Sequence, residues 1–114
     1  MDIKIIRKKI TKGELKNLAR KSFGEMLKAV VDLKHKILAV GGELHADAEA
    51  FLLEKGSKQK DLWGINIYPD KPKSKRIEFS ALINIRPSLG NRSIEIQDQK
   101  IKEKIRKIMD KLIK

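Results

Sequence analysis

A stripe of isoleucine and leucine near the C-terminus is the feature that most constrains how this chain can fold. Lysines fill positions between its members, and Asp98 stands where a helix N-cap is expected. A helix that is apolar along one side only must bury that side against another layer. We therefore predict a C-terminal helix packed on a sheet, with a buried face made of Ile101, Ile105, Ile108, Leu112 and Ile113.

Two earlier stretches, Leu62 to Tyr68 and Arg76 to Ile85, alternate apolar and polar residues with the period of a strand. The loop between them is polar and interrupted by prolines, so it lies outside the sheet. If the two strands pair in register, one of their faces is apolar and forms core. The other face then presents Asn66, Tyr68, Glu78, Ser80, Asn84 and Arg86.

The remaining elements come from shorter signals. Ile3 to Ile6 is typical of a strand, and Thr11 with Glu14 has the spacing of a capping box at the start of a helix that ends near Gly24. Leu27 to Val40 favours an antiparallel hairpin, with a helix as the competing interpretation. Leu44, Ala48, Phe51 and Leu52 predict a helix that stops at Gly56. The order β-α-β-β-α-β-β-α predicts an α+β fold, with a mostly antiparallel sheet and the helices packed on one side.

Length and composition exclude several classes of protein. The 114 residues match the size of one domain, so we expect a single domain over residues 1–114. The absence of cysteine excludes disulfides, thiolate metal sites and cysteine nucleophiles. No apolar run could cross a bilayer and the start does not resemble a signal peptide, so we expect a cytoplasmic protein without a membrane partner. Phosphate-binding loops and dinucleotide motifs are missing, and we predict no cofactor.

The net charge of +12 is concentrated at the two ends of the chain. Residues 1–40 carry eleven basic and four acidic groups, residues 41–70 three and six, and residues 71–114 thirteen and five. A basic balance favours polyanions through counterion release. A solvated, lysine-rich surface of the kind that hyperthermophiles favour is the alternative, since aromatic residues do not interleave with the lysines.

An arginine-flanked turn follows the second alternating strand. Arg86 and Arg92 bracket residues 87–91, where Gly90 and Asn91 can adopt positive φ. Guanidinium forks beside exposed backbone amides suit a phosphate or a carboxylate. We therefore hypothesise a ligand-binding site made of Asn66, Ser80, Asn84, Arg86, Asn91 and Arg92. The structural alternatives are a polar cross-strand ladder and a plain turn held by Asn and Ser.

His45 is the candidate catalytic residue, because histidine titrates near neutral pH and could act as a general base with a carboxylate or with Asn91. On a helix, Glu43 and Asp47 share a face while His45 points roughly the opposite way, so a metal site from these three is not expected. The other histidine, His35, lies among lysines in a predicted turn and is expected to be solvated.

Several blocks together resemble a family of small uncharacterised prokaryotic proteins, a domain of unknown function. The blocks are Gly41 to Glu49 (GGELHADAE), Leu62 to Pro69 (LWGINIYP) and the pair Leu82 to Pro87 and Gly90 to Ser93 (LINIRP, GNRS). The resemblance spans essentially the whole chain. It implies a stand-alone cytoplasmic α+β domain and transfers no activity, substrate or catalytic residue.

Three functions remain open at this point. The leading hypothesis is an anion-binding domain, with or without hydrolytic chemistry, that uses the polar strand face, the arginine turn and His45. The second is a nucleic-acid-associated protein that uses Lys71, Lys73, Lys75, Arg76, Lys102, Arg106 and Lys107. The third is a homodimer in which the polar strand face is buried at a symmetric interface.

Overall fold

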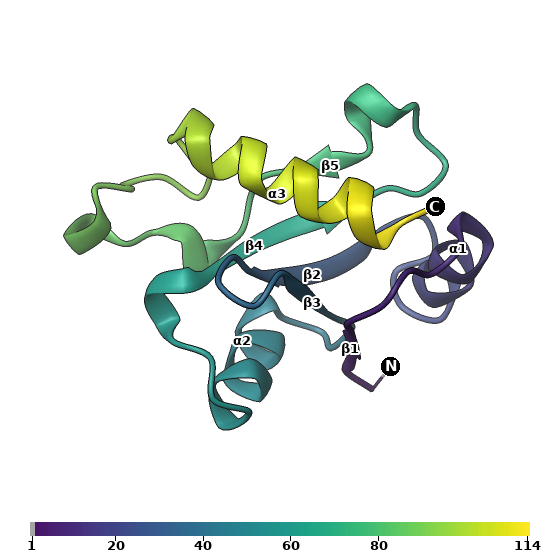
Figure 1. Cartoon of the computed structure of the whole chain (residues 1–114), viewed down its shortest axis with the longest axis horizontal. Helices are drawn as coiled ribbons and strands as arrows, with labels where there is room; N and C mark the ends of the chain where they lie inside the picture. Colours follow the sequence, from purple (N-terminus) through teal and green to yellow (C-terminus); the bar gives the residue numbers. More distant parts are fainter. Residues whose placement is uncertain (1) are drawn as a thin grey trace.

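A computed structural model describes residues 2–114 (Figure 1). The predicted order of strands and helices is confirmed. In chain order the elements are β1 (Lys4–Ile6), α1 (Lys12–Arg20), β2 (Leu27–Asp32), β3 (Ile37–Val40), α2 (His45–Glu54), β4 (Leu62–Ile67), β5 (Ile77–Glu78) and α3 (Gln99–Leu112). No helix within residues 2–114 has both the length and the apolar character needed to cross a membrane.

The five strands form one antiparallel sheet in the order β1-β3-β2-β4-β5, which confirms the predicted α+β class (Figure 1). The hairpin predicted between Leu27 and Val40 is β2 and β3, joined by a tight turn in which Lys36 has a φ of 57°. Strand β2 is central, because it pairs with β3 on one side and with β4 along its whole length on the other.

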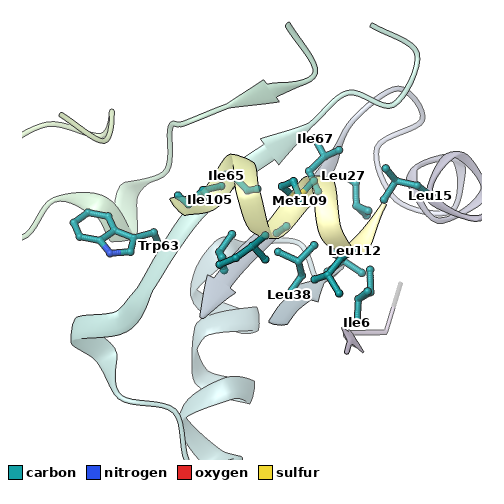
Figure 2. Packing of buried hydrophobic residues seen from close by; sticks show 14 of the residues in the cluster. Ile6, Leu15, Leu27, Leu38, Trp63, Ile65, Ile67, Ile105, Met109 and Leu112 are labelled. Carbon is teal, nitrogen blue, oxygen red and sulfur yellow. The ribbon is translucent and has the colours of Figure 1, made fainter. Parts of the chain in front are cut away.

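The largest hydrophobic cluster lies between one face of the sheet and the helices α1 and α3 (Figure 2). Helix α3 contributes the predicted stripe, with Ile105, Ile108 and Leu112 buried and Ile101 and Ile113 packed at the edges. Asp98 accepts a hydrogen bond from the backbone N of Lys100 at 2.8 Å, as expected of an N-cap. Burial of this stripe fixes α3 across the sheet.

Helix α2 covers the opposite face of the sheet, so the prediction that all helices pack on one side is wrong. Ala48 and Leu52 of α2 pack with Val30, Ala39 and Leu62 in a second cluster. The reason is visible in β2 and β3, whose central residues are apolar at consecutive positions and are buried on both faces. Such continuous apolar strands need a layer on each side.

The predicted strand from Arg76 to Ile85 is largely wrong, because only Ile77–Glu78 pair with β4. The chain then leaves β4. The backbone N of Ala81 donates to the carbonyl of Ile94, and the carbonyl of Phe79 accepts from the backbone N of Ile96. Leu82–Asn84 form a short 3₁₀ turn, and Ile85, predicted to be core, is 44% exposed. Residues 79–96 therefore form an excursion from the sheet.

The side chain of Asn84 replaces the missing strand beside β4. Its Oδ1 accepts from the backbone N of Gly64 at 2.8 Å, and its Nδ2 donates to the Gly64 carbonyl at 3.0 Å. A side-chain amide thereby satisfies the donor and the acceptor that a neighbouring strand would pair. The approach is close, since a Cβ on Gly64 would lie 2.5 Å from the Cβ of Ala81.

We expect Gly64→Ala to destabilise the protein by about 1–3 kcal/mol, because the added methyl group would overlap Ala81 and crowd Ile83 and His45. Gly13→Ala in α1 is the matched control, since its nearest neighbour would be 3.7 Å away and alanine favours helix. Urea denaturation of both variants measures the difference. Equal unfolding midpoints for the two variants would contradict the close approach.

Candidate functional site

The polar residues predicted to bind a ligand lie mainly inside the fold. Asn84 is completely buried, and besides Gly64 it donates to the carbonyl of Ile94 at 3.1 Å. Asn66 is also buried and donates to Glu78 at 2.7 Å and to the carbonyl of Ser80 at 3.3 Å. Asn66 and Asn84 are thus enclosed within the fold, whereas Glu78 on the same predicted face is exposed.

Arg86 is buried and its terminal nitrogens are engaged within the protein. One of them donates to the carbonyls of Gln59, at 2.9 Å, and Leu62, and the other contacts Glu49 Oε2 at 2.6 Å. The guanidinium also lies over the ring of Trp63, 5.3 Å from its centroid. These contacts join α2, the start of β4 and the excursion. The N–H donors of a guanidinium held in this way point at acceptors within the protein.

Asn91 ties the arginine-flanked turn together. Its Nδ2 donates to the carbonyls of Asn84, Ser93 and Glu95 at 2.8, 2.9 and 3.1 Å, and its Oδ1 accepts from the backbone N of Gln97 at 2.9 Å. Arg92 is exposed, so the structure does not bring the guanidinium groups of Arg86 and Arg92 together. Internal hydrogen bonds account for Asn84, Arg86 and Asn91 without a ligand.

His45 is buried at the start of α2 and donates from Nε2 to the carbonyl of Ile65 at 2.9 Å. Burial lowers its pKa from the ordinary value, the positive charge of Lys28 adds to the lowering, and the contacts with Ile65 and Asn66 only partly offset it. The ring is therefore neutral at pH 7. It lies beside Asn66, whose buried Oδ1 has no partner among the described residues.

The carboxylates close to His45 in the sequence make contacts with other groups. Asp47 accepts from the backbone N of Leu44 at 3.1 Å and caps its own helix, while Glu49 pairs with Arg86. Within residues 2–114, no three side chains of His, Asp or Glu come together in a way that could hold a metal ion. His45 is placed as a structural donor rather than beside an acid that would activate it.

Asp32 organises a buried cluster that the sequence interpretation missed. Its carboxylate accepts from Ser57 Oγ at 2.6 Å, contacts His35 Nδ1 at 2.7 Å and accepts from the backbone N of Lys34 and His35. Burial by itself would raise the pKa of Asp32, but the hydrogen bonds from Ser57 and His35 together lower it. His35 is exposed, as predicted, but it also contacts the buried Asp32, which the sequence did not indicate. An aspartate at the start of a hairpin turn is the signal for such a cap.

Several cations on the outer surface of α3 have no ion pair within residues 2–114. We use the term α3 face for this surface and the two clefts beside it. The first, the Arg76 cleft, has a volume of about 580 Å³ and lies between α3 and the segment 73–79. Figure 1 shows this segment, β5 included, beside the yellow helix. The cationic residues that line it are Lys73, Arg76, Arg106 and Lys114.

The second cleft, the Lys104 cleft, lies between α3 and the β2–β3 turn and has a volume of about 430 Å³. Leu33 and Ile108 are its apolar residues. Its other lining residues are Lys36, Lys104, Lys107 and Lys111. None of these four lysines has an ion-pair partner within residues 2–114. Asp110, paired with Lys73 at 3.4 Å, is the one acidic side chain that lines either cleft in the described part of the chain.

The nucleic-acid hypothesis had grouped the loop 71–76 with the final helix, and the structure brings Lys73 and Arg76 together with Arg106 in the Arg76 cleft. Lys102 is turned away toward Glu95, with which it pairs at 3.2 Å. In the Lys104 cleft, Lys36, Lys104 and Lys111 were not singled out from the sequence. Their contribution depends on packing of the hairpin turn against α3, which no local pattern encodes.

We expect Arg86→Ala to cost about 3–5 kcal/mol of stability, because it leaves Glu49 buried without its partner. Arg92→Ala removes the same side chain from an exposed position and should change stability by less than about 0.5 kcal/mol. Chemical denaturation of the two variants tests the assignment, and similar losses in both would contradict a structural role specific to Arg86.

The neutral state of His45 gives a pH dependence with a defined sign. In the unfolded chain the ring takes up a proton near its ordinary pKa of 6.5, whereas in the folded protein it does so only at lower pH. The contribution of His45 to stability is thus complete above pH 6.5 and declines as the pH falls toward the lowered pKa. An NMR titration of the ring should show a midpoint below 6.5. A midpoint at or above that value would rule out the buried, neutral state.

Comparison with known proteins identifies the family. No curated protein and no solved structure matches the chain. A family model described as "Protein of unknown function (DUF5674)" matches residues 4–112, nearly the whole chain and every strand and helix of the fold. The predicted resemblance to an uncharacterised domain is therefore confirmed. The chain belongs to this family of unknown function.

Proposed function

We propose that the α3 face binds the phosphate backbone of nucleic acid. The observation that carries the proposal is the pair of cation-lined clefts on opposite sides of one helix, whose lining in the described residues includes eight cationic side chains and one acidic side chain, Asp110. Glu103 is a second acid on the exposed surface of α3. Such a surface attracts a polyanion, because each phosphate that a cation neutralises releases condensed counterions. A nucleic-acid role fits the cytoplasmic location that the sequence predicts.

The two clefts follow from the geometry of α3. Successive helical residues are rotated by about 100°, so Lys104, Lys107 and Lys111 lie on one flank while Arg106 and Asp110 lie on the other. The buried stripe points at the sheet between these flanks. Both flanks therefore face solvent at the places where α3 meets its neighbours, and the lysine stems cover apolar surface while their ammonium groups stay in water.

This proposal moves the anion-binding role away from the residues that the sequence favoured. A site built on Arg86, Asn84 and Asn91 would have to break hydrogen bonds that hold the excursion to β4 and α2. In contrast, Arg106 and the four lysines of the Lys104 cleft have no ion pair to break in the described structure. Binding by these five cations therefore breaks no ion pair, and the one ion pair within the clefts among residues 2–114 is the exposed pair of Lys73 and Asp110.

We expect the protein to bind a labelled oligonucleotide at low ionic strength, with an affinity that falls steeply between about 50 and 200 mM salt. Replacement of Lys104, Lys107 and Lys111 by glutamine should reduce the slope of log K against log salt by about 2, since each single-strand phosphate contact contributes about 0.7. Fluorescence anisotropy across a salt series measures both quantities.

A matched control uses three exposed lysines on the other side of the sheet. Lys55, Lys58 and Lys60 lie at and beyond the end of α2, and their replacement by glutamine changes the net charge equally. This control variant should keep nearly the wild-type slope. Equal losses in the two triple variants would show that net charge, and not the α3 face, drives binding. Absence of binding at low salt would refute the proposed function.

A further inference from the structure

The Arg76 cleft differs in chemistry from the Lys104 cleft. Beneath its cationic rim it has an apolar floor contributed by Ile77, Phe79, Met109 and Ile113. Its volume of about 580 Å³ is in the range of pockets that enclose small organic groups. A backbone phosphate needs only the rim. The floor suits a flat, apolar group that enters together with an anion.

Arg76 has an unsatisfied donor at this cleft. Its Nε is buried and has no hydrogen-bond partner among the described residues, and its side chain takes part in no ion pair there. A buried donor without a partner is costly, and most buried polar groups in proteins avoid that state. A phosphate oxygen in the cleft would satisfy this donor once the Arg76 side chain turned its Nε toward the cleft.

Arg106 places a second guanidinium at the same rim. Its Cζ lies 5.0 Å from the centroid of the Phe79 ring, and no acid pairs with it in residues 2–114. A planar guanidinium can stack against a nucleobase or form a fork on a phosphate. The Lys104 cleft offers only ammonium groups, which act as point charges without such planar recognition.

We infer that the Arg76 cleft receives an unpaired nucleotide, so that the nucleic acid bound on the α3 face is single-stranded. The base lies on the floor of Ile77, Phe79 and Met109, and its phosphate is held by Arg76 and Arg106. In a duplex the bases are stacked and paired inside and cannot reach this floor without being extruded. This inference rests on the proposed function and specifies its substrate class.

The test compares a labelled single-stranded oligonucleotide with its duplex by anisotropy at fixed salt, using the full chain. The wild type should prefer the single strand. The double variant Arg76→Gln and Arg106→Gln removes cations that contact phosphate in either ligand, so it should weaken both. Its loss of affinity should be about tenfold larger for the single strand than for the duplex, the order of one lost stacking interaction. The lysine variant at 104, 107 and 111 should weaken both ligands and keep the preference.

A second measurement reports on the floor itself. Adenosine monophosphate should shift the methyl NMR signals of Ile77, Met109 and Ile113, because the ring current of the base acts on groups it covers, whereas inorganic phosphate should leave them nearly unchanged. Equal effects of the two probes would overturn the inference. Circular dichroism of the arginine variant should show a cooperative thermal transition close to that of the wild type, since the replacements break no ion pair in the described structure and remove only the contact of Arg106 with Phe79.

The outcomes separate the two proposals. Equal affinity for single strand and duplex, with equal losses in the arginine and lysine variants, would overturn the single-strand inference and leave phosphate binding by the α3 face in place. Absence of binding to either oligonucleotide at low salt would overturn both. If the wild type and the arginine variant both prefer duplex, the Arg76 cleft has no part in recognition.

Discussion

The pairing of the Asn84 side chain with the backbone of Gly64 is the contact on which the C-terminal half of the structure depends. It satisfies the backbone N–H and C=O groups of Gly64, at a point on the edge of β4 that β5 does not reach. The chain can therefore leave the sheet without leaving buried backbone groups unpaired. The excursion then returns at Ile96, which is completely buried, and leads into α3. Without that amide, residues 82–85 would have to continue as a strand or leave Gly64 unpaired.

The position of α3 follows from this return and from its apolar stripe, and the clefts follow from the position of α3. A helix laid across a sheet contacts it along one side only, so grooves remain where neighbouring segments rise beside it. In this chain the neighbours are the segment 73–79 and the β2–β3 turn. The segment contributes Arg76 and the turn contributes Lys36. Many residue types at these rims would pack equally well, so the core does not require cations there.

The elements with a strong periodic signal could be predicted from the sequence, and the contacts that define the candidate sites could not. The α3 stripe, the capping of α1 and α3 and the hairpin of β2 and β3 are local patterns, readable within one or two turns of chain. Asn84 and Gly64 are 20 residues apart, and Arg86 and Glu49 are 37 apart. Neutral hydrogen-bonding residues on a strand indicate either a binding surface or a buried internal network, and the choice depends on which distant segment covers them.

The charge distribution gains a physical meaning once these contacts are known. Two acids from the middle of the chain are engaged internally, with Asp47 capping α2 and Glu49 paired to the buried Arg86. Asp32 is likewise enclosed by Ser57 and His35. Carboxylates held in this way offset little of the charge on the far side of the sheet, where the α3 lysines and Arg106 lie. The field at the α3 face is therefore more positive than the net charge of the whole chain implies, because field strength depends on where opposite charges are placed.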